Sequence, residues 1–216
     1  MFDKSKIFRP EYYFDLKDLS FKEIFKNISY VWQIITHIQD FIESSFKIEK
    51  LIKNYDKNKL VSIGEGSVIQ DGVSITGPAI IGKNCFIGHG SLIRENCLLG
   101  DNVHVGHATE IKNSILLDGA ISAHLNYIGD SIIGRNVNIS GGTIFANLRL
   151  DKNYVSIKLG NEKIDTGLLK FSSIIGDNCM IGVNSVLNPG TLIGRNSVVY
   201  PLTSVTGFYK EESVIK

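Results

Sequence analysis

The sequence predicts a mainly β protein, a left-handed parallel β-helix of hexapeptide repeats with an N-terminal α-helical segment and a hairpin excursion. Three observations support this fold class. Aliphatic residues recur at every sixth position, a helical pattern precedes this repeat, and glycine is confined to the repeat region. All 21 glycines of the 216 residues lie beyond Leu60, and residues 1–56 contain none. The composition therefore changes where the fold is expected to change.

The six-residue period is the main signal for the β-helix. It fits neither an α-helix, with 3.6 residues per turn, nor a flat strand, with a period of 2. It fits short strands joined by corners, where Asn or Gly adopts a positive φ at little steric cost. Residues 18 apart should then stack about 4.8 Å apart on neighbouring coils. The repeat positions are Ile63, Ile69, Ile75, Ile81, Ile87, Ile93, Leu99, Val105, Ile111, Leu117 and Ala123, then Ile128, Ile133, Ile139 and Phe145 after two steps of five, and finally Ile175, Ile181, Leu187, Ile193, Val199 and Val205.

These patterns divide the chain into three parts: a helical segment over 1–58, the β-helix over 59–206 and a tail over 207–216. A capping box formed by Ser20 and Glu23 and an apolar stripe at helical spacing predict one helix from about 21 to 46. Its apolar stripe is interpreted as a packing surface. Alternating residues after Tyr154 predict a hairpin within the excursion 148–170, where the repeat is interrupted.

Charge and cysteine content narrow the function. A formal net charge of +1 argues against nucleic-acid binding, because no cationic excess would attract a polyanion. Three cysteines without a CxxC pair indicate free thiols in a reducing, cytoplasmic setting. The N-terminal residues lack the apolar core of a signal peptide, and no apolar run reaches the ~18 residues of a membrane span.

Three segments carry a family resemblance: Glu110–Ser114, Ala123–Asp130 and Asn136–Asn147. Together they resemble the C-terminal acetyltransferase domain of bifunctional sugar-1-phosphate nucleotidylyltransferase/acetyltransferases. The resemblance covers about residues 60–205, and the segment from Asp165 to Asp177 is similar to the archaeal branch of that family. It implies an acyltransferase that moves the acetyl group of acetyl-CoA to the amine of an amino-sugar 1-phosphate.

The resemblance also implies residue roles. His124 matches the general base, which must remove a proton from the attacking amine. Glu110 matches a residue that supports the sugar or the base. The Gly141 amide matches the group that stabilises the thioester oxyanion, and Gly141 and Val183 match positions at the acetyl-CoA site. A structural corner histidine is the alternative interpretation of His124.

Substrate binding is assigned in the same way. Lys112 and Arg94 match the cations that bind the sugar phosphate, and their spacing of 18 independently predicts that they stack on one column. Without the resemblance they would be interpreted as solvated surface charges. The residues implied for the sugar are Tyr127, Asn138 and Asn147. A homotrimer is implied too, with the excursion closing over a neighbour's site.

The sequence departs from the family in three places. The family has a phosphate-binding lysine about six residues after the position of Asn147, where this chain has Asn153, with Lys152 beside it as the expected substitute. Tyr200-Pro201 stands where small residues commonly accommodate CoA. No nucleotidyltransferase domain precedes the β-helix, so a separate nucleotidyltransferase is a candidate partner.

Other constellations are interpreted as structural. His89 and His107 are 18 apart and should stack, but no further histidine completes a metal site, and no metal is expected. The three cysteines fit small buried positions better than reactive thiols. Two functional alternatives remain open: an O-acyltransferase with another acceptor, and a non-catalytic trimeric partner of a separate sugar-phosphate nucleotidyltransferase.

Overall fold

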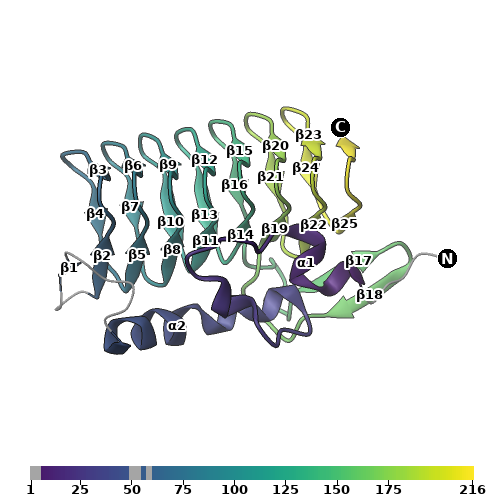
Figure 1. Cartoon of the computed structure of the whole chain (residues 1–216). Helices are drawn as coiled ribbons and strands as arrows, with labels where there is room; N and C mark the ends of the chain where they lie inside the picture. Colours follow the sequence, from purple (N-terminus) through teal and green to yellow (C-terminus); the bar gives the residue numbers. More distant parts are fainter. Residues whose placement is uncertain (1–5, 49–54, 57–59) are drawn as a thin grey trace.

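The computed structural model describes residues 6–48, 55–56 and 60–216. Short strands stack in parallel along one axis and form the three sides of a β-solenoid (Figure 1). This confirms the mainly β, parallel β-helix fold that the six-residue period predicts. We name the three sides I, II and III in the order in which the chain meets them.

Side I is the nine-stranded sheet, in which β1 pairs antiparallel to β2 and all other neighbours pair in parallel. Sides II and III contain eight and seven parallel strands. The strands of side I are β1 Tyr55–Asp56, β2 Val61–Ile63, β5 Ala79–Ile81, β8 Cys97–Leu99, β11 Ser114–Leu116, β14 Ile132–Ile133, β19 Ser173–Ile175, β22 Thr191–Ile193 and β25 Phe208–Tyr209. The strands of side II are β3 Val68–Ile69, β6 Phe86–Ile87, β9 His104–Val105, β12 Ile121–Ser122, β15 Asn138–Ile139, β20 Met180–Ile181, β23 Val198–Val199 and β26 Val214–Ile215. The strands of side III are β4 Ser74–Ile75, β7 Leu92–Ile93, β10 Glu110–Lys112, β13 Tyr127–Gly129, β16 Ile144–Phe145, β21 Val186–Leu187 and β24 Ser204–Val205.

The corners have the predicted chemistry. Asn84, Asn96 and Asn102 adopt φ values of 52°, 58° and 59°. Asparagine tolerates this left-handed region better than most residues, so it turns the chain at low cost. The aliphatic residue of each side points inward and joins one continuous core. The solenoid is thus held by stacked aliphatic columns and by hydrogen bonds between successive coils.

The register of one coil differs from the sequence prediction. Leu116 pairs with Leu99, and Ser122 pairs with Val105, so these two residues occupy the inward positions. Leu117 and Ala123, the predicted positions, are each one residue out of register. The first five-residue spacing therefore runs from Ile111 to Leu116, earlier than the predicted one from Ala123 to Ile128. The reason is that the corner at Asn113, with φ 45°, is one residue shorter. Leu117 is nevertheless buried, because it packs against the N-terminal segment outside the solenoid.

The N-terminal segment is built of several short helices, where the sequence predicts one helix from 21 to 46. They are η1 Lys6–Phe8, α1 Pro10–Tyr13, η2 Lys22–Phe25, η3 Val31–Gln33 and α2 Ile34–Ile48. Asn27, at φ 59°, interrupts the predicted helix. Ser20 does not cap it, and the capping box is formed instead by Tyr30 and Gln33. The expected boundary at 58/59 lies outside the described residues.

Side I is covered by this segment, as its apolar stripe predicts. Ile38 and Ile42 of α2 are fully buried and belong to one cluster with Leu98, Ile115 and Ile132, which face outward from side I. Figure 1 shows α2 running parallel to the solenoid axis beneath its earlier coils. One side of the solenoid is therefore closed by the chain itself.

The excursion forms the predicted hairpin, β17 Ser156–Leu159 and β18 Glu162–Asp165. A bridge between Leu148 and Lys170 joins its two ends. Val155 and Ile157 are fully buried and share a cluster with Leu192 of β22, so the hairpin packs on later coils of its own chain. If the excursion also closes over a neighbouring copy, as the resemblance implies, only its exposed residues can contact that copy.

The C-terminal residues extend the solenoid. The sequence predicts a tail over 207–216, but β25 pairs with β22 and β26 pairs with β23. Ile215 is 5% exposed and belongs to the solenoid core. The repeat was missed there because Tyr209 takes an aliphatic position and the step before it is only four residues long.

Asp177 connects the N-terminal segment to the solenoid. Its carboxylate accepts the Asp15 N–H at 2.6 Å through one oxygen and the Arg135 N–H at 2.7 Å through the other. Burial raises the pKa of Asp177, while these two N–H groups act in the opposite direction.

We expect Asp177→Asn to lower the free energy of unfolding by about 1–3 kcal/mol, because the new NH₂ group would face an N–H donor. Urea denaturation measures this loss, and limited proteolysis should show release of the N-terminal segment. Asp40→Asn, on the exposed face of α2, is the matched control and should change neither result. Equal stability of the two variants would contradict the proposed connection.

Candidate active site

Four predicted site residues lie together on side III. Glu110 pairs in register with Leu92 on one neighbouring strand and with Tyr127 on the other. The Arg94 N–H donates to the Ile111 carbonyl at 2.8 Å, which places Arg94 beside Lys112 on the adjacent coil. The stacking predicted from the spacing of 18 is therefore confirmed for Arg94 and Lys112. Both cations lie where the strands of side III end.

Carboxylates accompany both cations. Arg94 Nη1 lies 3.0 Å from Glu110 Oε1, and Lys112 Nζ lies 3.7 Å from Glu95 Oε1. The hydrogen bond to Glu110 is the main reason that the pKa of Arg94 is raised. Burial opposes ionisation of Glu95, but hydrogen bonding and the charges of Arg94 and Lys112 lower its pKa overall. Two cations and two anions thus form one half-buried cluster, and Glu95 is a member that the sequence reasoning missed.

A second polar network borders this cluster. Asn113 Nδ2 donates to Asp130 Oδ1 at 2.7 Å, and Asn147 donates both to Asp130 and, at 3.1 Å, to the Tyr127 hydroxyl. Burial, followed by the charges of Asp130 and Glu110, raises the pKa of Tyr127. The phenol therefore stays protonated and can donate a hydrogen bond at neutral pH.

Gly129 explains the direction of the Tyr127 side chain. A Cβ at Gly129 would lie 2.8 Å from Tyr127 Cζ and 2.9 Å from Asn147 Nδ2, so the ring folds over this glycine towards Asn147. Gly129 pairs with Lys112 in the sheet. The Tyr127 ring therefore lies one coil from Lys112, and the two predicted binding residues are brought together.

His124 lies at the opposite edge of side III, on the corner that joins it to side II. His89 and His107 occupy the same corner, and their rings are parallel with centroids 5.9 Å apart. Each donates from Nδ1 to a carbonyl of the preceding coil, His89 to Asp71 at 2.6 Å and His107 to His89 at 2.7 Å. This confirms the predicted stack and gives both rings a structural role.

The His124 ring is directed the other way, towards the following coil. A Cβ at Gly141 would lie 2.8 Å from His124 Nε2 and 2.7 Å from Cδ2. Among the described residues, the His124 ring forms no hydrogen bond, and the ring is exposed. This difference from His89 and His107 favours a chemical role for His124.

Gly141 and Val183 continue the same corner. The Asn184 N–H donates to the Gly141 carbonyl at 3.0 Å, so Val183 lies one coil beyond Gly141, and its side chain is 45% exposed. The Gly141 N–H donates to no other backbone group within the described part of the chain. An unpaired N–H beside an exposed imidazole is suited to stabilising a nearby oxyanion.

Asn138 is not brought to the rest of the site. It lies on β15 of side II, between Ile121 and Met180, whereas Tyr127 and Lys112 lie on side III. These two sides diverge from the corner that carries His124. A single chain therefore presents the predicted residues as two groups.

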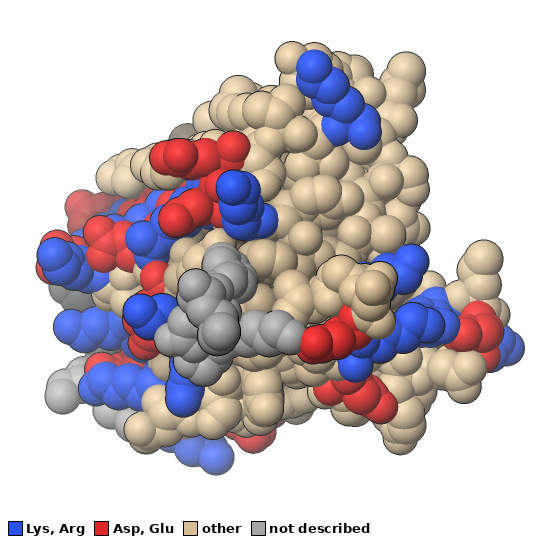
Figure 2. Space-filling view, turned by 90° about the vertical axis from the view of Figure 1, so that its right-hand side faces the viewer, with Lys and Arg blue, Asp and Glu red and all other residues tan. Residues whose placement is uncertain are grey.

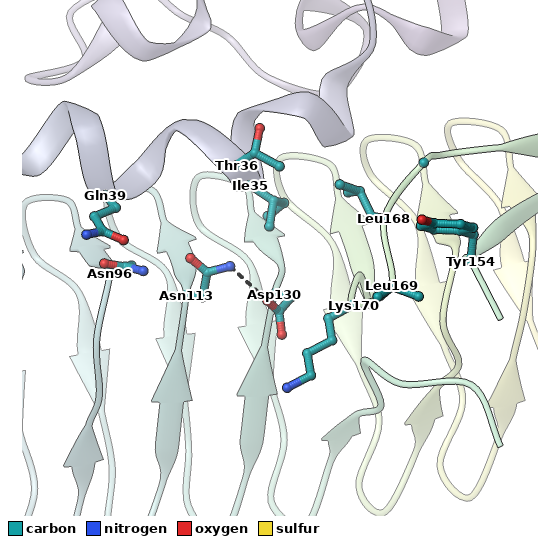
Figure 3. A pocket seen from close by; sticks show the side chains of 11 residues that line it. Ile35, Thr36, Gln39, Asn96, Asn113, Asp130, Tyr154, Leu168, Leu169 and Lys170 are labelled. Carbon is teal, nitrogen blue, oxygen red and sulfur yellow. Dashed lines mark hydrogen bonds between the residues drawn. The ribbon is translucent and has the colours of Figure 1, made fainter. Parts of the chain in front are cut away.

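Lys152 lies on an exposed turn in the excursion, where its N–H donates to the Arg149 carbonyl at 3.1 Å. Lys170 is closer to the site in the fold. The Leu148–Lys170 bridge closes the excursion, and the next residue, Phe171, donates its N–H to the Asn147 carbonyl at 3.0 Å. Figure 3 shows the Lys170 side chain extending past Asp130, away from α2.

Sequence reasoning missed Lys170 because it counted residues along the chain. A position six after Asn147 lies out in the excursion, whereas Lys170 stands beside Asn147 where the chain returns. The sequence did contain one indication that Lys170 lies near the site: the segment Phe171–Asp177, which resumes the solenoid, begins directly after this lysine.

The remaining candidates are metal-binding side chains and the three cysteines. No cluster of three metal-binding side chains occurs in the described ranges. Cys85, Cys97 and Cys179 are buried and unpaired, and burial raises the pKa of both Cys97 and Cys179 to about 12. Such thiols are poor nucleophiles near neutral pH.

The solenoid and its six-residue repeat define a hexapeptide-repeat fold. Residues 173–200 match the family model described as the hexapeptide repeat of succinyl-transferase, and residues 75–160 match the GMPPB C-terminal domain. The second match contains Arg94, Lys112 and His124. The repeat structure that the sequence predicts is therefore supported independently.

Curated relatives agree with the resemblance predicted from the motifs. The chain is 36% identical over 70 residues to the bifunctional sugar-1-phosphate nucleotidylyltransferase/acetyltransferase of Sulfurisphaera tokodaii, covering 32% of this chain and 18% of that protein. It is 44% identical over 69 residues to bifunctional GlmU of Methanococcus aeolicus, covering 32% of this chain and 16% of that protein. It is 33% identical over 122 residues to bifunctional GlmU of Clostridioides difficile, covering 56% of this chain and 22% of that protein. The chain thus matches only about a fifth of the length of these relatives.

Among solved structures, the chain is similar to a point mutant of AntD, an N-acyltransferase from Bacillus cereus, in complex with dTDP and coenzyme A. That likeness has a TM-score of 0.45 and 16% identity, and it covers 76% of this chain and 84% of that chain. Within the described residues, every helix is too short or too polar to cross a bilayer.

Proposed function

We propose that this chain is an acetyl-CoA-dependent N-acetyltransferase that acts on an amino-sugar 1-phosphate of the glucosamine or galactosamine type. The proposal rests mainly on one observation: an imidazole and a pair of cations lie at opposite edges of side III. An exposed imidazole, which has no hydrogen bond to any residue that the structure describes, stands at the start of the strands of side III, and two stacked cations stand at their end. The relatives named for acetyltransferase activity support the choice of acetyl-CoA as donor.

The proposed reaction assigns His124 as general base. The lone pair of the neutral substrate amine attacks the thioester carbonyl of acetyl-CoA, and the His124 imidazole takes the proton that the nitrogen loses as the C–N bond forms. The Gly141 N–H stabilises the oxyanion of the tetrahedral intermediate. The C–S bond then breaks, the amide forms, and the CoA thiolate takes up the proton from His124. Val183, on the next coil, would contact the pantetheine arm.

The acceptor would lie over side III. Tyr127 and Glu110 are placed for the sugar hydroxyls, since one is a protonated phenol and the other a carboxylate. Arg94 and Lys112 are placed for the phosphate, which forms short charge-assisted hydrogen bonds with such cations. Asn147 holds Tyr127 in position and Asn138 would join from a neighbouring copy.

A panel of acceptors tests the reaction class. Thiol release from acetyl-CoA is expected with glucosamine 1-phosphate or galactosamine 1-phosphate. Hydroxyl acceptors of the same size, such as glucose 1-phosphate, are expected to be poor substrates. Turnover of the hydroxyl acceptors alone would instead support an O-acyltransferase, and absence of acetyl-CoA binding would support a non-catalytic subunit.

A variant of Lys170 tests whether this residue contributes to binding of the phosphate without taking part in the chemical step. We expect Lys170→Met to raise KM for the sugar phosphate by about tenfold with a small change in kcat, because a charge-assisted hydrogen bond of about 1.5 kcal/mol is lost. Lys163→Met, in the same excursion and also exposed, is the control. An unchanged KM in the Lys170 variant would remove this residue from the site.

We further propose a homotrimer as the active form. Side II carries an outward column of exposed apolar side chains, among them Ile121, Met180 and Val198, and Asn138 lies within it. Figure 2 shows that charge is spread unevenly over the end of the molecule, with a broad area almost free of Lys, Arg, Asp and Glu. The exposed apolar column on side II suits contact with further copies. The free thiols support the cytoplasm as the setting.

Met180→Glu tests the assembly. Met180 is 47% exposed in one chain, so a carboxylate there should leave the monomer folded but would be buried without a partner in a trimer. We expect light scattering to show monomers and acetyl transfer to fall by about tenfold or more. Lys163→Glu is the exposed control. A trimer that survives Met180→Glu would rule out side II as its interface.

A further inference from the structure

A pocket that none of the predicted site residues explains lies between α2, the corner joining sides III and I, and the segment 167–170 in which the excursion returns to the solenoid. Its volume is about 410 Å³, which is within the range of small-molecule sites. Three separate parts of the chain line it: Gln39 on α2, Asn96 and Asn113 on the corner, and Leu168 and Leu169 in the excursion. Figure 3 shows these side chains around one space.

The two ends of the pocket differ in chemistry. At one end, Gln39 and Asn96 face each other, with Asn113 on the next coil, so amide donors and acceptors converge there (Figure 3). At the other end are Tyr154, which is 55% exposed, and the two leucines. Amides suit hydroxyls and the edge of a heterocycle, and an aromatic ring suits its flat face.

Asn96 adds a hydrogen-bonding group that the fold leaves unused. Its Oδ1 is buried and has no hydrogen-bond partner among the described residues. Such an acceptor costs free energy unless a donor reaches it. Gln39 donates its Nε2 to Glu43 at 2.9 Å, so its carbonyl oxygen is left as a further acceptor at the same end.

The pocket begins where the proposed phosphate site ends. Lys112 is followed directly by Asn113, and Arg94 precedes Asn96 by two residues. Lys170 lines the pocket and extends past Asp130, whose carboxylate is held by Asn113 and Asn147. Along the strands of side III the order is therefore imidazole, sugar-binding residues, phosphate-binding cations and then this pocket.

This order matches a phosphate that carries a further group. A substituent on the anomeric phosphate would pass the cations and enter the pocket. A lipid substituent would meet three amides and a carboxylate, and burying those groups against hydrocarbon is unfavourable. A nucleoside offers hydroxyls and a heterocyclic edge to the amides and a flat face to Tyr154.

We propose that this pocket binds the nucleoside of a nucleoside-diphosphate amino sugar, so that the chain also accepts the nucleotide-linked form of its sugar 1-phosphate. The proposal rests on the acetyltransferase function proposed above and names its substrate class. The base lies against Tyr154, Leu168 and Leu169, and the amides bind the ribose and the base edge. Arg94, Lys112 and Lys170 bind the diphosphate.

Binding of free nucleotides tests the pocket without relying on catalysis. Calorimetry of the intact chain with UDP, dTDP, GDP and ADP is expected to show submillimolar binding of at least one of them, about tenfold tighter than glucosamine 1-phosphate. Gln39→Ala and Tyr154→Ala should each weaken this binding about five- to tenfold, for one lost hydrogen bond or stacking contact. His37→Ala, exposed on the same helix and outside the lining, is the control.

The outcomes separate the two proposals. Nucleotide binding that both pocket variants weaken supports the pocket, whether or not acetyl transfer is found. Acetylation of glucosamine 1-phosphate without binding of any of the four nucleotides overturns the pocket and leaves the proposed function standing. Nucleotide binding unaffected by Gln39→Ala and Tyr154→Ala also overturns it, since the nucleotide would then bind elsewhere.

Discussion

Replacing His124 by alanine is expected to lower kcat for acetyl transfer by about 10²- to 10⁴-fold, the usual contribution of a positioned general base. The substrate amine must lose a proton to attack the thioester, and no other imidazole of this corner is available. His89 and His107 donate their Nδ1 protons to carbonyls of the preceding coil, whereas the His124 ring rests on Gly141 and has no hydrogen bond within the described part of the chain. Steady-state thiol release measures the effect.

His107→Ala is the matched control for this variant. It removes an imidazole from the same corner, one coil away, and should lower stability slightly with little effect on kcat. Circular dichroism and light scattering should show that His124→Ala keeps its fold and assembly. Retained turnover in His124→Ala, or an equal loss in His107→Ala, would contradict the assignment of the base.

Replacing Lys112 by methionine is expected to lower kcat/KM for a phosphorylated amino sugar by about 10- to 100-fold, since a hydrogen bond between charged groups contributes about 1.5–3 kcal/mol. Only 16% of the Lys112 side chain is exposed, so its charge is weakly screened. The loss should shrink for glucosamine without phosphate. It should also leave Glu95 without its second cation.

Lys83→Met, on an exposed corner of the same solenoid, is the control and should behave as the unmodified chain. Comparison of the two acceptors decides the role of Lys112. If both acceptors lose activity equally, Lys112 acts on the structure of the site and not on the phosphate. If neither loses activity, the phosphate is bound elsewhere.

The fold was predictable because the signal is periodic and local. A branched aliphatic every six residues, with Asn or Gly at the corner, leaves few arrangements other than three short strands per coil. The slip at Leu116 and Ser122 was not predictable, since Leu117 is also apolar and is also buried, against the N-terminal segment. The break at Asn27 was missed because the apolar spacing continues across it.

The candidate site was predictable only in part. Arg94 and Lys112 follow from the spacing, and His124 follows from the resemblance. Packing between coils is what brings Glu95, Asp130 and Lys170 to the site. Because the chain leaves the solenoid at Leu148 and returns at Lys170, residues far apart in the sequence become neighbours, and counting along the chain cannot identify them. Asn138 illustrates the opposite case, because its motif is clear but its side of the solenoid faces away from Tyr127.

Transfer of a labelled acetyl group tests the central claim most directly. Acetyl-CoA labelled in the acetyl carbon is incubated with the chain and with amino sugars linked to phosphate or to a nucleoside diphosphate, and the product is identified by mass spectrometry. The account predicts an amide-linked label on the amino group, formed by the unmodified chain and by His107→Ala but not by His124→Ala. Label on a hydroxyl, or no label on any of these acceptors while acetyl-CoA binds, would contradict it.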